Sequence, residues 1–92
     1  MTNLRVVLAD DHELIRQGVV AVLAAIPQVE LVAECADYPQ LMAAVDNHLP
    51  DVVVTDIRMP PTGTDEGIQA ALAIRKAHPH VGVVVLSQFA EP

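Results

Sequence analysis

The chain has 92 residues and a mass of 9.8 kDa, which is the size of one small domain. Its hydrophobic content of 52% is enough for one packed core and excludes disordered and collagen-like chains. The net charge of −7 repels a phosphate backbone, so nucleic-acid binding by these residues is not expected.

The first third of the chain and its single cysteine bear on cellular location. Cys35 cannot form an intrachain disulfide, and nothing in the composition indicates an oxidising compartment. The acidic pair Asp10 and Asp11 comes too early for the apolar region of a signal peptide. The longest apolar run, residues 19–26, is far too short to cross a membrane. We therefore expect a soluble cytoplasmic domain without membrane attachment.

Four short apolar runs along the chain are bounded by polar residues. Runs of this kind are typical of strands that are buried on both faces of a sheet. The expected strands are Leu4 with residues 6–9, Val29–Cys35, residues 52–55, and Gly82–Leu86.

Between the expected strands, apolar residues recur at helical spacing. Pro27 ends the first of these helices and Asp11 is placed to cap its start, whereas Pro39 begins the second and Pro50 follows it. Residues 59–64 read as a loop before a third helix, and Gly67 is expected to serve the loop geometry. The expected apolar positions of the three helices are Leu14 or Ile15, Val19, Val22, Leu23 and Ile26; then Leu41, Met42, Val45 and Leu49; then Ile68, Ala71 and Leu72.

This strict alternation of strands and helices predicts an α/β fold. The sheet would be parallel, with right-handed crossovers and helices on both of its faces. A Walker A phosphate loop and the dinucleotide-binding glycine fingerprint are both absent, and no His or Cys pair has the spacing of zinc ligands.

Polar side chains follow three of the expected strands. Asp10 and Asp11 come after the first strand, Asp56 after the third and Ser87 after the fourth. Ligands of open parallel sheets bind at the carboxyl ends of the strands, where these side chains would gather if the first and third strands are neighbours. Two carboxylates about 4 Å apart repel each other by roughly 4 kcal/mol at an effective dielectric constant of 20. A hard divalent cation such as Mg²⁺ would offset that repulsion.

A carboxylate beside such a cation can also accept a phosphoryl group. The simpler interpretation of any single aspartate at a strand end is a cap or a turn residue, but four polar residues at carboxyl ends favour a shared site. His12 adjoins the acidic pair; we prefer a solvated position in the first helical turn, with an approach to the site as the alternative.

Three motifs together resemble the receiver domain of two-component response regulators. They are VVLADDHELIRQG from residue 6, VVVTDIRMPP from residue 52, and VVVLSQF from residue 83. The opening motif is most similar to the subfamily with a NarL/LuxR-type helix-turn-helix output domain. The resemblance implies a flavodoxin-like, doubly wound parallel sheet with strand order 2-1-3-4.

The resemblance also implies a role for each matching residue. Asp56 would accept a phosphoryl group from a sensor histidine kinase, and Ser87 would be the switch hydroxyl. The residues implied to hold Mg²⁺ are Asp10, Asp11, Asp56 and the backbone carbonyl of Arg58, and those implied to tune the lifetime of the phosphoryl group are Arg58, Gln88 and Phe89.

The chain departs from the family pattern in two respects. Gln88 stands where the family usually has a small residue, so its bulk affects the expected turnover. The sequence stops at Pro92, before the fourth helix, fifth strand and fifth helix of a complete receiver. The lysine at the end of that fifth strand therefore has no counterpart, and Lys76 is interpreted as a surface charge.

These departures set expectations for domain organisation and partners. We expect residues 1–92 to be a C-terminally incomplete receiver without its DNA-binding output domain, through which alone DNA would be contacted. An uncovered fourth-strand edge invites pairing with another chain, so we expect a homo-oligomer formed through that edge or by swapping of elements.

Two functions of other classes remain as alternatives to a phospho-accepting switch. One is a Mg²⁺-dependent phosphohydrolase that works through an aspartyl phosphate. The adjacency of Asp10 and Asp11 and the late position of Asp56 weaken that alternative. The other is an unphosphorylated interaction or dimerisation module.

Overall fold

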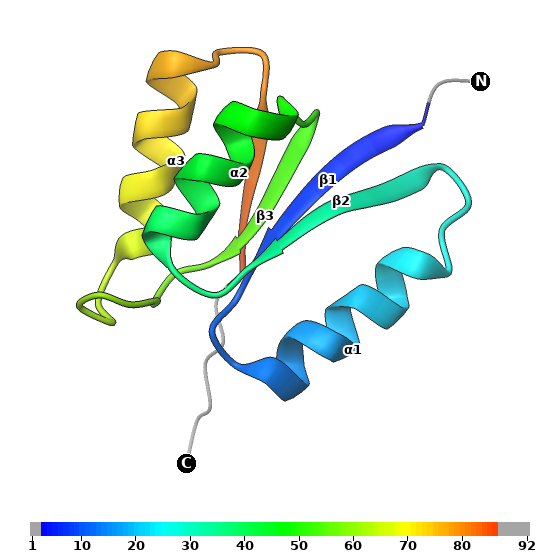
Figure 1. Cartoon of the computed structure of the whole chain (residues 1–92), viewed down its shortest axis with the longest axis horizontal. Coiled ribbons are helices and arrows are strands. Elements are labelled where there is room, and N and C mark those ends of the chain that lie inside the picture. The colour runs from blue at the N-terminus through cyan, green and yellow to red at the C-terminus, as the bar shows by residue number, and fades with distance from the viewer. Residues whose placement is uncertain (1–2, 87–92) are drawn as a thin grey trace.

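The computed structural model describes residues 3–86 and shows the expected alternation of strands and helices (Figure 1). Asp56 belongs to the third strand rather than following it. The elements are β1 (Leu4–Ala9), α1 (Glu13–Ala24), β2 (Val29–Cys35), α2 (Tyr38–His48), β3 (Val52–Asp56), α3 (Glu66–Ala77) and β4 (Gly82–Leu86).

The four strands form one parallel sheet in the order β2-β1-β3-β4, which confirms the predicted shortened flavodoxin-like arrangement. Ala9 of β1 pairs with Cys35 of β2 on one side and with Thr55 of β3 on the other. Asp56 pairs with Leu86 of β4. The carboxyl ends of all four strands therefore meet along one edge of the sheet.

The helices cover the two faces of the sheet unequally (Figure 1). α2 and α3 lie on one face and α1 lies on the other. Alternate residues of each strand point to opposite faces of the sheet. The residues that point toward α2 and α3 form the main core together with the inner residues of these two helices. The buried members of this core are Val7, Ala9, Cys35, Leu41, Ala44, Val45, Val53, Met59, Ala70, Ile74 and Val81.

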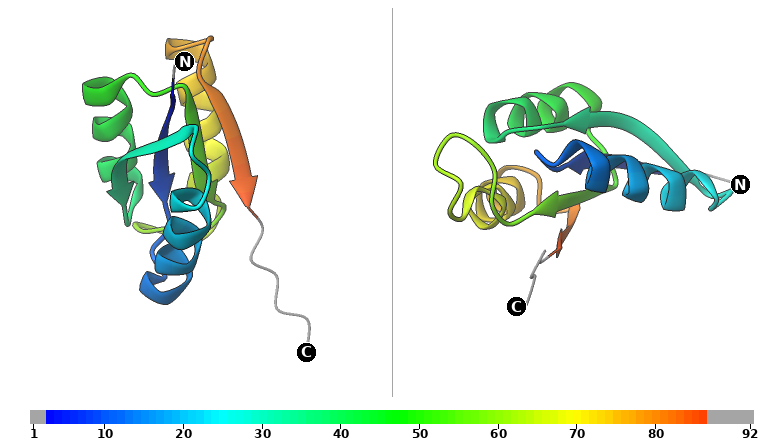
Figure 2. Two further views of the ribbon diagram at one scale, coloured as in Figure 1. Left: turned by 90° about the vertical axis from the view of Figure 1, so that its right-hand side faces the viewer. Right: turned by 90° about the horizontal axis from the view of Figure 1, so that it is seen from below.

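No residue of α1 is buried, although its apolar residues have the spacing of an amphipathic helix. Leu14 is 83% exposed and Val22 is 64% exposed, whereas Val19 and Leu23 are half-buried. Viewed from the α1 side, β4 is not covered by any helix of residues 3–86 (Figure 2). Within the described residues, only part of the apolar stripe of α1 therefore packs against the rest of the protein.

The buried face of α3 differs from the predicted one. Ile68 is 45% exposed and Leu72 is 70% exposed, so the expectation that they line the core is wrong. Small residues occupy much of the inner face, because α3 approaches the backbone at the end of β3 closely. The buried residues of α3 are Glu66, Gly67, Ala70 and Ile74.

The start of α2 confirms the predicted place of Pro39, and the start of α1 corrects the expected cap. The carboxylate of Asp37 caps α2 by accepting a hydrogen bond from the Gln40 N–H at 2.8 Å, and Pro39 lies in the first turn as predicted. Asp11 does not cap α1. The N-cap position belongs to His12, whose N–H donates to the Asp10 carboxylate at 2.8 Å. Asp10 and Asp11 are thereby left to face the end of the sheet.

Within residues 3–86, no helix has both the length and the apolar character that crossing a membrane requires.

Candidate functional site

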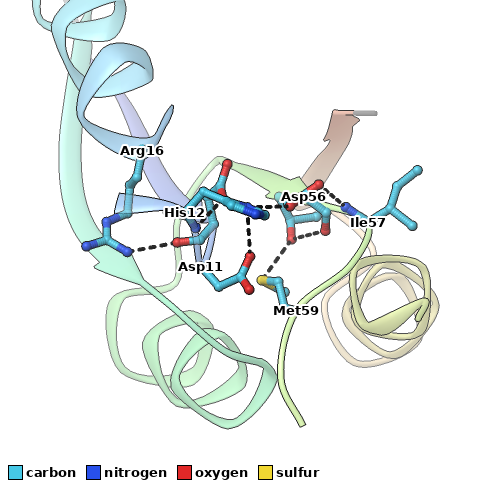
Figure 3. Close-up of polar contacts among 8 residues, drawn as sticks. Asp11, His12, Arg16, Asp56, Ile57 and Met59 are labelled. Carbon is cyan, nitrogen blue, oxygen red and sulfur yellow. Dashed lines mark hydrogen bonds and ion pairs between the residues drawn. The ribbon is translucent and has the colours of Figure 1, made fainter. Parts of the chain in front are cut away.

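The three aspartates predicted to share a site do so. Figure 3 shows two of them, Asp11 and Asp56, with His12 beside them. Asp10 and Asp11 follow β1, and Asp56 ends β3, the strand paired with β1. One ligand atom from each aspartate and one from His12 all lie within 4.8 Å of one another. The parallel register of β1 and β3 is what brings these carboxylates together.

Two of the three carboxylates are withdrawn from water. Asp10 is 3% exposed and Asp56 is 5% exposed, whereas the side chain of Asp11 is 32% exposed. Burial raises the pKa of Asp56, and the nearby charge of Asp10 raises it further. The Ile57 N–H opposes this rise by donating to Asp56 Oδ1 at 2.8 Å. The site therefore concentrates negative charge at a position where that charge is disfavoured.

A network on the β1 side fixes the backbone of Asp10. Its N–H donates to the Cys35 carbonyl at 2.9 Å, which continues the β1–β2 ladder past the end of β1. Its own carbonyl accepts from Arg16 Nη1 at 2.8 Å, and Arg16 Nε also bonds Glu34 Oε1 at 3.2 Å. Sequence reasoning assigned no role to Arg16. The only available signal was its place in the ADDHELIRQG motif, one and a half helical turns after the acidic pair.

His12 points into the acidic cluster, as in the less favoured of the two predicted alternatives (Figure 3). Its Nδ1 lies 3.2 Å from Asp11 Oδ1, 3.4 Å from Asp10 Oδ1 and 3.9 Å from Asp56 Oδ2. The side chain is nevertheless 60% exposed, so the ring forms the solvent-facing side of the cluster.

On the β3 side, the first turn of α3 lies against the backbone of Asp56. The Gly67 N–H donates to the Ile57 carbonyl at 2.7 Å. A Cβ on Gly67 would lie 1.9 Å from the Asp56 carbonyl oxygen. The expectation of a loop role for Gly67 is therefore wrong, since this residue permits the close approach of a helix to a strand.

Glu66 ties the loop between β3 and α3 to the start of α3. Its carboxylate accepts hydrogen bonds from the N–H and the hydroxyl of Thr62 and from the N–H of Thr64. The hydroxyl of Thr62, aided by these backbone donors, lowers the pKa of Glu66 to about 2. A buried glutamate thus organises the loop that follows Asp56, a role that its place beside Asp65 in the sequence did not indicate.

The donor set at the end of the sheet suits a hard divalent cation. Carboxylate oxygens are the ligands that Mg²⁺ takes from proteins, usually with several waters and an oxygen of a phosphate group. The partial exposure of Asp11 leaves room for such waters, and the buried Asp10 and Asp56 supply the negative charge. The residues present therefore fit a magnesium ion.

Four other predicted site residues are Arg58, Ser87, Gln88 and Phe89, of which the structure describes only Arg58. Ser87, Gln88 and Phe89 lie outside the described residues. The side chain of Arg58 is exposed, as is that of Lys76 on α3, which accords with a surface position for this lysine.

Comparisons with known proteins agree with this geometry. A family model described as the response regulator receiver domain matches residues 6–92. The transcriptional regulatory protein DegU of Brevibacillus brevis is 37% identical over 85 residues, which are 92% of this chain and 35% of that protein. The transcriptional regulatory protein NarL of Mycobacterium tuberculosis is 40% identical over 90 residues, which are 98% of this chain and 40% of that protein.

A solved structure of the signal receiver domain of NarL from Mycobacterium tuberculosis has the same fold, with a TM-score of 0.84 at 38% identity. The match covers 100% of this chain and 72% of that one. The chain spans about two fifths of the length of the curated relatives it matches. Fold, acidic cluster and sequence agree, and this chain belongs to the response regulator receiver domain family, a signalling rather than a catalytic family.

Proposed function

We propose that the chain accepts a phosphoryl group on Asp56 from a sensor histidine kinase of a two-component system, with Mg²⁺ held by the acidic cluster. The observation that carries the proposal is the burial of Asp56 against Asp10, beside Asp11, at the end of the sheet in a chain of the receiver family. The proposal includes a cytoplasmic location, where such a kinase would present its phosphohistidine.

The hydrogen bonding of Asp56 distinguishes its two oxygens. Oδ1 accepts from the Ile57 N–H at 2.8 Å, which leaves Oδ2 as the nucleophile. Attack of Oδ2 on phosphorus forms the O–P bond of an aspartyl phosphate and breaks the P–N bond to the kinase histidine, which departs with the electron pair and takes up a proton. A cation bound here supplies charge neutralisation to the incoming phosphoryl oxygens.

We assign the cation ligands, the switch hydroxyl and the residues that tune turnover in the same proposal. Asp10, Asp11, Asp56 and the Arg58 carbonyl hold Mg²⁺. Ser87 is the switch hydroxyl, and Arg58, Gln88 and Phe89 tune the lifetime of the phosphoryl group. Residues 1–92 act here as receiver residues, and any DNA contact that switches transcription belongs to an output domain outside them.

Intact mass spectrometry after reaction with Mg²⁺ and acetyl phosphate tests this function. We expect one base-labile phosphoryl adduct on the parent chain, none on the Asp56→Asn variant and none when EDTA replaces Mg²⁺. Asp51, which is exposed and precedes β3, gives the matched control, since Asp51→Asn should keep the adduct. An adduct that persists in Asp56→Asn would contradict the assignment of the acceptor.

We also propose that copies of the chain associate through the β4 side of the sheet. The support is the exposure of large apolar side chains there, with Val84 48% and Leu86 38% exposed. Monomeric soluble proteins rarely leave contiguous apolar patches of this kind open.

A further inference from the structure

His12 adds a nitrogen donor to a site whose other donors are oxygens. We propose that the Nδ1 atom of His12 is a direct ligand of the divalent cation, so that the site binds transition ions such as Co²⁺ with an advantage over Mg²⁺ that depends on this ring. The inference rests on the proposed cation site at Asp10, Asp11 and Asp56 and adds a residue and an ion preference to it.

The spacing of the donor atoms supports a shared ion. Two ligands in adjacent positions around an octahedral ion, each about 2.1 Å from it, lie about 3.0 Å apart. Two ligands of a tetrahedral ion with bonds of about 2.0 Å lie about 3.3 Å apart. Nδ1 of His12 lies 3.2 Å and 3.4 Å from oxygens of Asp11 and Asp10. These two separations are close to those of neighbouring ligands on one ion. The 3.9 Å between Nδ1 and Asp56 Oδ2 is nearer to the separation of about 4.2 Å between opposite ligands of an octahedral ion.

The backbone aims the ring at the cluster. His12 occupies the N-cap of α1 in an extended conformation, and its N–H is held by the Asp10 carboxylate at 2.8 Å. Its carbonyl accepts the Arg16 N–H at 2.8 Å, the first hydrogen bond of the helix. The residue is thus fixed on both sides, and the ring projects between Asp11 and Asp56 (Figure 3).

Ligand chemistry gives the expected preference. Mg²⁺ binds hard oxygen donors and gains little from an imidazole. Imidazole suits the later first-row ions, whose affinities for mixed nitrogen and oxygen sites rise from Mn²⁺ toward Cu²⁺. Removal of the ring should therefore weaken Co²⁺ binding far more than Mg²⁺ binding. A competing role is a protonated ring that occupies the place of the cation, in which case its removal would tighten the binding of both ions alike.

Isothermal titration calorimetry of the 92-residue chain with MgCl₂ and with CoCl₂ decides between these roles. For His12→Ala we expect the Kd for Co²⁺ to rise roughly tenfold or more while the Kd for Mg²⁺ changes less than about twofold. The visible absorption of bound Co²⁺ should also shift, because one nitrogen ligand is lost. His80→Ala is the control, since this exposed histidine lies beyond α3, and both Kd values should stay unchanged.

The outcomes separate this inference from the proposed function. Equal changes in the two Kd values, whether weaker or tighter, would overturn direct ligation by His12 and leave the magnesium site standing. Failure of the parent chain to bind either ion would overturn the proposed cation site and with it this inference.

Discussion

Gly67 stands where any side chain would collide with the backbone that carries Asp56. A Cβ there would lie 1.9 Å from the Asp56 carbonyl oxygen, 2.8 Å from its carbonyl carbon and 2.9 Å from Ile57 Cα. These atoms belong to backbone that also forms the β3–β4 ladder and the Gly67–Ile57 hydrogen bond. The absence of a Cβ at Gly67 thus allows α3 to lie this close to the backbone that carries Asp56.

Gly67→Ala should destabilise the protein by about 1–3 kcal/mol or more, because the helix or the strand end must move. Urea unfolding measures the effect. Gly18→Ala is the matched control: Gly18 is an exposed glycine inside α1 with no atom within 4 Å of the added Cβ, so alanine should stabilise the protein by about 0.5–1 kcal/mol. Changes of the same sign in both variants would contradict the close approach at Gly67.

Glu66 makes the stability of the loop after Asp56 dependent on pH. Its folded-state pKa is lowered from 4.5 to about 2, so the native state binds fewer protons than the unfolded state in that interval. The stabilisation by the ionised carboxylate is therefore complete above the unfolded-state pKa and is lost as pH falls toward 2. We expect the advantage of the parent over Glu66→Gln in urea unfolding to be larger at pH 7 than at pH 3.

An unchanged difference between the parent and Glu66→Gln at the two pH values would contradict the role of the charged carboxylate. Glu13→Gln, at an exposed position in the first turn of α1, controls for the loss of one negative charge.

The strands were predicted from the sequence more accurately than the buried faces of the helices. The four apolar runs matched the strands within one or two residues. β1 and β3 are buried along most of their length, and strands of that kind leave a continuous apolar signal. In α3 the large apolar residues Ile68 and Leu72 point outward, and the contact face is built around Gly67 and Ala70. A prediction based on the large apolar residues therefore chooses the wrong buried face of α3, because close packing against the strand requires small residues there.

A pair of truncations in α3 tests the corrected face. Ile74 is fully buried against the sheet, and Ile74→Ala should cost about 2–5 kcal/mol. Leu72 is 70% exposed, and Leu72→Ala should change stability by less than about 0.5 kcal/mol. Comparable losses in the two variants, measured by urea unfolding, would mean that α3 is rotated from the described position.

The site was predictable where strands position it and not where loops do. Asp10, Asp11 and Asp56 could be grouped from the sequence, because parallel strands place their carboxyl ends side by side. The contacts of His12 and Arg16 depend on how the chain turns from β1 into α1, and no periodic signal encodes that turn.

The two faces of the sheet are covered differently. The face under α2 and α3 holds the core, whereas the other face carries α1 alone among the described helices (Figure 2). Apolar side chains of α1 and β4 are consequently exposed, among them Leu14, Val22, Val84 and Leu86. The proposed self-association follows from this asymmetry.

Sedimentation velocity over a range of protein concentrations tests the association. We expect the parent chain to sediment as a dimer or larger species and Val84→Lys to shift toward the monomer, because a charge would be buried in the interface. Asn47→Lys, on the exposed side of α2, controls for the added charge and should leave the association unchanged. A monomeric parent at high concentration would contradict the proposal.

The acidic cluster also has a consequence for the whole fold. Charges within 4.8 Å of each other repel by roughly 3 kcal/mol or more at an effective dielectric constant of 20, and burial of Asp56 adds to the penalty. A site kept for binding rather than for stability should lower the stability of the free protein and raise that of the bound one.

The most direct test of that claim is the free energy of unfolding of the parent and of Asp56→Asn at pH 7, with EDTA and with saturating Mg²⁺. With EDTA we expect Asp56→Asn to be the more stable protein, because asparagine keeps an acceptor for the Ile57 N–H and removes the disfavoured charge. With Mg²⁺ we expect the parent to gain about 2.7 kcal/mol when the Mg²⁺ concentration is 100 times the Kd of the parent, and the variant to gain less because it lacks one carboxylate ligand. A variant that is less stable in EDTA, together with a parent that gains nothing from Mg²⁺, would contradict the account.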